Sequence, residues 1–326
     1  MATRHGKTDL NIGARPNKCT MKHPKPATPK AMTAALQPES ERQNTITSKP
    51  APITSAAAWT DTPALASAIT PSKQAKLPAL FISHGAPTLA IEQSATTSAL
   101  ARIGQNLPKP RAIIIMSAHW QSAKLEISSN PRPKTWHDFS GFAPELYELQ
   151  YPAVGQPALA ETLAQQLTAR GITCRVNPLR VSDHGVWAPL LHLYPEADIP
   201  IVQISLPRHY DSIACYQLGA QLAQLRAEQI LLIGSGNITH NLQALRWQAE
   251  SIDETAKDFK VWLLQQLKTD IPSALDWQQY PNYQNVHPSD EHLLPLFFAL
   301  GAGQRVSVVH QSMAHHSLGM DIYRFD

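Results

Sequence analysis

Short apolar runs alternate along the chain with longer segments in which apolar residues recur every three or four positions. The runs are rich in Ile, Val and Leu and show little alternation between polar and apolar side chains, which is typical of strands covered on both faces. On this pattern we predict six strands, at residues 78–83, 112–117, 172–176, 199–205, 230–234 and 305–310.

Helical periodicity fills much of the sequence between these strands. Apolar stripes predict helices at 156–170, 212–227 and 251–268, and an apolar helix is expected at 293–300. Because strands and helices alternate, we predict one α/β domain, a three-layer sandwich around a central, mostly parallel sheet. Two segments rich in proline and aromatic residues, 130–152 and 271–290, interrupt this alternation. We expect them to form the walls of a cleft.

The first 76 residues differ in composition from the rest of the chain. Residues 1–76 hold eleven Lys and Arg against four Asp and Glu, whereas residues 77–326 hold 17 against 21. The first segment has no apolar period, so we predict a disordered, basic tail rich in Pro, Ser, Thr and Ala, followed by a folded domain at 77–326. An organellar transit peptide is an alternative for the tail, but its prolines and acidic residues disfavour it. Because the positive charge belongs to the tail, we expect no nucleic-acid groove on the domain.

The apolar runs and the cysteines bear on the compartment. Every apolar run falls short of the roughly 18 residues that a membrane span needs, so no membrane partner is predicted. The three cysteines, Cys19, Cys174 and Cys215, are odd in number and lack the spacing of a metal site. Free thiols are typical of a reducing compartment, and we therefore expect a cytoplasmic location.

Four histidines stand where α/β folds bind their ligands. His84, His119 and His240 each follow an apolar strand, and His292 opens an apolar helix. The carboxyl ends of parallel strands meet at one edge of a sheet, and ligands bind in the crevice there. Imidazoles delivered from separate strands can converge on one ion, and neutral imidazole suits Zn, Fe, Cu or Ni. The sequence therefore predicts one divalent metal ion held by histidines.

Each of these histidines also has a structural interpretation. His84, followed by Gly85, fits a surface turn as well as a tight turn that faces the imidazole into a cleft. His119 could be a core histidine bonded to a backbone carbonyl, and His292 could simply begin a helix. These alternatives stay open on the residues alone.

Further candidates lie outside this group of four. His184 follows Asp183, which could orient it, although the side chains of adjacent residues seldom bond each other. His137 and Asp138 belong to the segment 130–152, and they either touch a substrate or lie on a surface loop.

Two local patterns near His240 and His292 lead to specific expectations. Gly234 and Gly236 do not form a dinucleotide-binding fingerprint, because the third glycine is missing, and we expect them to let the backbone turn sharply. Glu291 is the one obvious carboxylate beside a candidate ligand. Neighbours on a helix point about 100° apart, so either Glu291 or His292 can bind the metal, but hardly both.

The motifs in this order resemble those of the class III extradiol ring-cleavage dioxygenases, and most closely the 4,5-DOPA dioxygenase extradiol branch. The resemblance covers about residues 77–326 and rests on several short sequences together. They are Ser83-His84-Gly85-Ala86-Pro87, Ser117-Ala118-His119-Trp120, Trp136-His137-Asp138-Phe139, Asp183-His184-Gly185-Val186-Trp187, Gly234-Ser235-Gly236-Asn237 with Thr239-His240-Asn241-Leu242, and Glu291-His292.

This resemblance implies a single metal that binds O₂ and a catechol side by side. His84 and His119 match the paired ligands, His292 matches the third, and His240 matches a residue that serves as acid/base or as a further ligand. His184 matches another active-site histidine. The family's reaction implies Fe(II), with Zn(II) accepted by the same donors, and a neutral histidine that takes a proton from the catechol.

Two other functions remain open on the sequence. Four histidines without a carboxylate ligand also suit a zinc-dependent hydrolase. A non-enzymatic binding protein could keep the same cleft after losing the metal.

Overall fold

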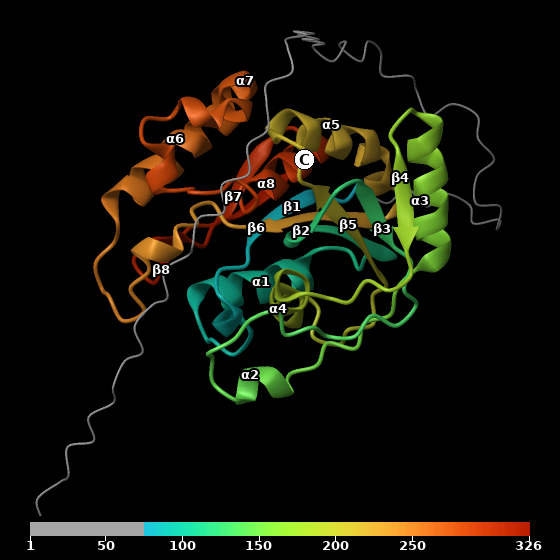
Figure 1. The fold of residues 1–326 in the computed structure, drawn as a ribbon, viewed down its shortest axis with the longest axis horizontal. Helices are drawn as coiled ribbons and strands as arrows, with labels where there is room; N and C mark the ends of the chain where they lie inside the picture. The colour runs from blue at the N-terminus through green and yellow to red at the C-terminus, as the bar shows by residue number, and fades with distance from the viewer. Residues whose placement is uncertain (1–74) are drawn as a thin grey trace, which may run out of the picture. The chain divides into compact units, whose positions relative to one another are not determined.

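The computed structural model describes residues 75–326, and the predicted tail lies outside the described residues up to residue 74. An eight-stranded sheet in the order β4-β3-β5-β2-β6-β1-β10-β7 forms the centre of the domain (Figure 1). Its strands are β1 Ala79–Ser83, β2 Ala112–Ser122, β3 Leu125–Ser128, β4 Cys174–Asn177, β5 Ile201–Pro207, β6 Ile230–Gly236, β7 Val306–His310 and β10 Ile322–Phe325. A second, two-stranded sheet pairs β8 Met313–Ala314 with β9 Leu318–Gly319.

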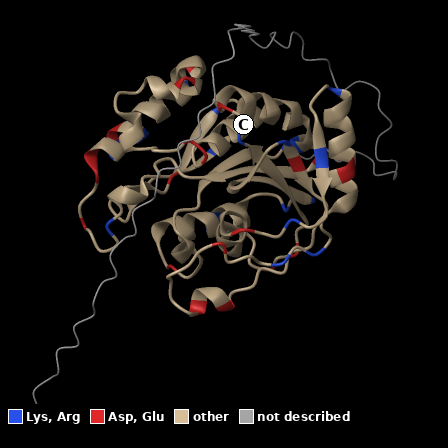
Figure 2. Ribbon diagram, in the orientation of Figure 1, with Lys and Arg blue, Asp and Glu red and all other residues tan. Residues whose placement is uncertain are grey.

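The middle of the large sheet is parallel and its flanks are mixed. β5, β2, β6 and β1 run parallel to one another, whereas β10 is antiparallel to β1 and β3 is antiparallel to β5. None of the four parallel strands contains a charged residue, and Figure 2 shows Lys, Arg, Asp and Glu distributed over the outer elements. Because these four strands are parallel, their carboxyl ends share one edge of the sheet.

Helices cover both faces of this sheet. Figure 1 shows α3, α5 and α8 on one face and α1 and α4 on the other. The helices are α1 Ala95–Asn106, α2 Glu145–Glu148, α3 Pro157–Ala169, α4 His184–Leu193, α5 Ser212–Leu222, α6 Glu254–Thr269, α7 Ile271–Leu275 and α8 Leu294–Ala302. Short 3₁₀ turns occur at η1 Pro87–Ala90, η2 Ala223–Glu228, η3 Leu242–Ala244, η4 Trp277–Gln279 and η5 Tyr283–Asn285.

Successive residues of the central strands belong to two separate cores. On β2, Ile113 and Ile115 pack with α1 and α4, whereas Ile114 and Met116 pack with α5 and α8. All four side chains are fully buried, because each lies on a strand covered by helices on both sides. The predicted three-layer α/β architecture is thus confirmed.

Each of the six predicted strands overlaps a strand of the large sheet, and the four predicted helices correspond to α3, α5 with η2, α6 and α8. The segments 130–152 and 271–290 are largely irregular, with short helices α2 and α7 inside them. The sequence pattern missed β3, β10, α1 and α4. Within residues 75–326, no helix is both long and apolar enough to cross a membrane.

Candidate metal centre

His84 follows the last residue of β1 and is fully buried. Gly85 adopts a φ of 64°, a left-handed conformation that glycine reaches at no steric cost. The backbone N–H of Gly85 donates to the side-chain oxygen of Asn237 at 2.9 Å, which ties the turn to the end of β6. The expected tight turn after the first strand is therefore present.

His119 lies within β2 rather than after it. The pairing of β2 with β5 shifts register between Met116 and Gln121, and His119 falls inside this irregularity. A bulge of this kind bends a strand and redirects its side chains. Gly185, in the first turn of α4, approaches so closely that a Cβ there would lie 3.0 Å from the His119 ring and 2.5 Å from Ser117 Oγ.

His292 lies two residues before α8, against the end of β6. Its carbonyl accepts a hydrogen bond from the N–H of Asn237 at 2.7 Å. A Cβ on Gly236 would lie 2.0 Å from this carbonyl, and a Cβ on Gly234 would meet the Pro295 carbonyl at 1.9 Å. The expectation that these glycines turn the chain was wrong: both lie in β6, and their lack of a side chain lets the segment before α8 pack against the strand.

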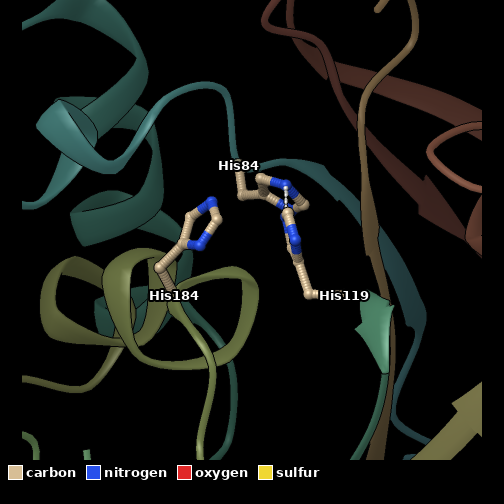
Figure 3. Close-up of side chains that lie close together, drawn as sticks. All are labelled: His84, His119 and His184. Atoms are coloured by element: carbon tan, nitrogen blue, oxygen red, sulfur yellow. Dashed lines mark hydrogen bonds between the residues drawn. The ribbon is translucent and has the colours of Figure 1, made fainter. Parts of the chain in front are cut away.

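His240 and His184 stand next to this group. The ring of His240 stacks on that of His292, with centroids 3.5 Å apart and planes inclined by 9°. His184 is the first residue of α4, and its ring centroid lies 4.1 Å from that of His119 and 5.4 Å from that of His84. Figure 3 shows the imidazole of His184 directed toward the other two.

The imidazoles converge through their Nε2 atoms. His119 Nε2 lies 3.0 Å from His84 Nε2 and 3.4 Å from His292 Nε2. Two groups of three residues each bring their ligand atoms within 4.8 Å of one another. The first group is His84, His119 and His184, and the second is His240, Glu291 and His292. All five predicted histidines thus meet at one edge of the sheet, and either three-residue set could hold a metal ion.

The tautomer of His84 follows from a chain of contacts that begins in α4. Pro189 has no N–H to donate to the carbonyl of Gly185, four residues earlier. The hydroxyl of Ser235 donates to this carbonyl at 2.5 Å instead. Since its only proton is used there, Ser235 Oγ must accept from His84 Nδ1, 3.0 Å away. The lone pair of His84 therefore resides on Nε2 and faces the cluster.

Carboxylates fix two more of the rings. Glu291 Oε1 lies 2.9 Å from His292 Nδ1, and Asp138 Oδ1 lies 2.9 Å from His184 Nδ1. A carboxylate accepts, so both Nδ1 atoms carry the proton and both Nε2 atoms present lone pairs. The expectation that Glu291 and His292 point apart was wrong, because these residues precede α8 and do not follow helical geometry.

The electrostatics of the cluster favour neutral imidazole. Burial, reinforced by the neighbouring histidines, holds the pKa values of His84, His119 and His292 well below the usual value. Burial likewise lowers the pKa of His240 to about 4. Burial alone would raise the pKa of Asp138, but the hydrogen bonds from His184 and its proximity outweigh burial and lower it. Neutral imidazoles beside ionised carboxylates are the form in which histidine binds metals.

These residues meet the requirements of a metal site. His84 and His292 both present lone pairs to His119 Nε2, and a single N–H on that atom could satisfy only one of them. A divalent cation can accept all three lone pairs at once. The partners Ser235, Asp138 and Glu291 supply the hydrogen bonds that orient metal-binding histidines.

Sequence reasoning did not identify two of these partners. Ser235 lies 151 residues from His84 along the chain, and Asp138 lies 46 residues from His184. Both contacts exist only through tertiary structure. The Trp136-His137-Asp138-Phe139 motif was a signal for Asp138, but it did not indicate which histidine the carboxylate would contact.

Aromatic side chains of the segment 130–152 adjoin the histidines. Phe139 lies 5.7 Å from His184 between ring centroids and 5.4 Å from Phe142. Phe142 in turn contacts the half-exposed Trp247 at 5.8 Å. A row of aromatic rings thus leads from the histidine cluster to the surface, and such rings suit an aromatic ligand.

The fold and the site define an α/β protein with a histidine-rich candidate metal centre at the carboxyl edge of its parallel strands. The model of the catalytic LigB subunit of aromatic ring-opening dioxygenase matches residues 78–326. The chain belongs to this extradiol dioxygenase family, and its similarity to named dioxygenases identifies it as an oxygenase.

Relatives support this assignment over most of the chain. The 4,5-DOPA dioxygenase extradiol of Escherichia coli K12 is 36% identical over 240 residues, covering 70% of this chain and 85% of that protein. The Beta vulgaris protein of the same name is 33% identical, covering 75% and 95%. The crystal structure of an uncharacterised Escherichia coli K12 protein matches with a TM-score of 0.68 at 30% identity, covering 77% of this chain and all of that one.

Proposed function

We propose that this chain cleaves the ring of a catechol with O₂, beside rather than between the two hydroxyl groups, at a single metal ion. His84, His119 and His292 would hold the metal, with His240 as a fourth ligand or an immediate neighbour. The observation that supports this proposal is the convergence of the three Nε2 atoms. The Nε2 of His119 lies 3.0 Å from that of His84 and 3.4 Å from that of His292.

Fe(II) is the proposed metal, because extradiol cleavage is redox chemistry. When bound, Fe(II) would supply Lewis acidity toward a catechol oxygen and electron transfer to O₂. The same donors would accept Zn²⁺, which has no redox chemistry.

Two histidines next to the proposed ligands would move protons. A catechol bound through one oxygen still carries a proton on the other, and a positioned base must remove it. His240 stacks on His292, and His184 lies beside His119 with its Nε2 lone pair free. Burial keeps His240 neutral, as a base in this step must be. His184 lies close enough to His84 and His119 to serve as a ligand as well.

We propose a small catechol such as DOPA as the substrate. The names of the Escherichia coli and Beta vulgaris relatives favour DOPA. The rings of Phe139 and Phe142 would contact an aromatic substrate as it approaches His184. We also propose a cytoplasmic location, which the free thiols of Cys174 and Cys215 support and cell fractionation would test.

Anaerobic reconstitution tests the function. The protein is loaded with Fe(II) or Zn(II), mixed with a panel of catechols that includes DOPA, and exposed to O₂. We expect O₂ uptake and a ring-opened product from the iron form only. Ester or amide hydrolysis by the zinc form, without ring opening by the iron form, would instead establish a zinc hydrolase. Catechol binding without turnover in either form would establish a binding protein.

A further inference from the structure

The loop that carries Asp138 is fastened to the start of α4. The N–H of Trp136 donates to the Ser182 carbonyl at 2.7 Å, and the N–H of Ser182 donates to the Lys134 carbonyl at 2.9 Å. The indole N–H of Trp187 donates to the Trp136 carbonyl at 3.0 Å. These bonds hold the loop in register with the residues that precede His184, so Asp138 lies at the N-terminus of α4.

The residue that would ordinarily cap α4 is engaged elsewhere. Asp183 occupies the N-cap position but makes no side-chain capping bond. Its fully buried carboxylate accepts from Ser117 Oγ at 2.7 Å and pairs with the guanidinium of Arg180. The first N–H of the helix, on His184, is therefore left for another acceptor.

Asp138 supplies that acceptor and contacts the ring of the same residue. Its Oδ1 accepts from the backbone N–H of His184 at 2.9 Å and lies 2.9 Å from His184 Nδ1. Its Oδ2 lies 3.6 Å from Nδ1 of His119, on β2. The side chains of Asp138 and His184 are each only 7% exposed, so water competes little for these contacts.

We propose that Asp138 is a positioning residue that sets the ring orientation and tautomer of His184 and, through its second oxygen, of His119. This inference rests on the proposed function, in which both imidazoles act at the metal. With the proton of His184 held on Nδ1, its Nε2 faces His84 and His119 as a lone pair. One carboxylate thus aligns imidazoles from two different elements on the same centre.

The competing explanation is that Asp138 only caps the helix, and Asp138→Asn separates the two roles. Asn caps helices about as well as Asp, so this variant should keep the wild-type melting temperature. However, an amide carries no charge and presents an N–H₂ group on one side. If its oxygen takes the place of Oδ1, it accepts both bonds from His184, and its N–H₂ group then faces Nδ1 of His119. A donor at that position disfavours the Nδ1–H form of His119.

The experiment measures the tautomer directly and uses no catechol. Histidine is labelled with ¹⁵N, and the His119 and His184 signals are assigned by their loss in His119→Gln and His184→Gln. We expect the Nδ1–H form of both rings in the wild type. In Asp138→Asn, His184 should keep this form and His119 should lose it, whereas in Asp138→Ala both rings should become mixtures of tautomers. Metal affinity, measured by chelator competition with Zn²⁺, should fall about 10- to 100-fold, as is typical when a partner of a ligating histidine is changed. Glu148→Gln, which alters an exposed acid on α2, is the matched control and should change neither quantity.

The outcomes separate this inference from the proposed function. An Asp138→Asn protein in which His119 keeps the wild-type tautomer and metal affinity is unchanged would overturn the positioning role toward His119. An Asp138→Ala protein in which His184 keeps its Nδ1–H form would overturn it toward His184. So would equal losses of melting temperature and metal affinity in Asp138→Asn and Asp138→Ala, because a capping role alone would explain them. Since neither readout requires ring cleavage, a wild-type enzyme that fails to open catechols would leave this result standing.

Discussion

Replacement of Ser235 by alanine should weaken the metal centre although it replaces none of the proposed ligands. The hydroxyl of Ser235 is fully buried and joins two groups, the Gly185 carbonyl and His84 Nδ1. Without it, a buried carbonyl and a buried imidazole N–H both lose their partner. An orphaned buried group costs about 1–3 kcal/mol, so the loss of both partners should lower the free energy of unfolding by about 2–6 kcal/mol.

The same substitution frees the His84 ring to rotate or change tautomer. Because a partner of a ligating histidine typically contributes 10- to 100-fold to metal affinity, Ser235→Ala should weaken metal binding by about this factor. Urea denaturation of the apo protein gives the stability, and chelator competition gives the affinity.

Ser205→Ala is the matched control for this prediction. Ser205 is a fully buried serine on β5 that accepts from Ser122 Oγ and from the N–H of Glu126, at 2.7 and 2.8 Å. Among the described residues, its hydrogen bonds involve no histidine. This control should lose stability and keep its metal affinity. If Ser235→Ala lost stability but bound metal as tightly as Ser205→Ala, the tautomer argument for His84 would be refuted.

Three further substitutions or deletions probe other parts of the account. Gly185→Ala would place a Cβ 2.5 Å from Ser117 Oγ and 3.0 Å from the His119 ring, so it should lower both melting temperature and metal affinity; unchanged values of both would contradict the packing. His240→Phe should reduce turnover by about 10²–10⁴-fold if the residue is a base, and metal content on the same preparations shows whether it is also a ligand. Deletion of residues 1–76 should leave turnover per site and melting temperature nearly unchanged, and a large loss of either would show that the tail contributes to the domain.

The sequence predicted the four parallel strands β1, β2, β5 and β6 because these strands are apolar on both faces and lack charge. It missed α4 because this helix contains Gly185 and Pro189, which are unfavourable inside helices. Both residues contribute to the candidate site. Gly185 lets α4 pack closely against Ser117 and His119 of β2, and Pro189 has no N–H, so the Gly185 carbonyl accepts from Ser235 instead. At the candidate metal centre, tertiary packing therefore outweighs the low helix propensity of these two residues.

The candidate ligands were predictable, whereas the residues that orient them were not. His84 follows β1 and His119 lies near the end of β2, and these parallel strands end at the same edge of the sheet, so topology alone brings the two residues together. The contacts of Asp138 and Ser235 depend on how loops and a helix pack across that edge. Glu291 was noticed as a neighbour of His292, but its hydrogen bond depends on the non-helical backbone before α8.

The most direct test of the central claim is the metal content of the purified protein after anaerobic loading with Fe(II), compared with that of the double variant His84→Ala, His119→Ala. Two of the three converging nitrogens are lost in the variant. The set that remains is His240, Glu291 and His292, in which Glu291 is already hydrogen-bonded to His292 Nδ1. The account predicts one iron per chain in the wild type and almost none in the variant. One iron per chain retained by the variant would contradict it.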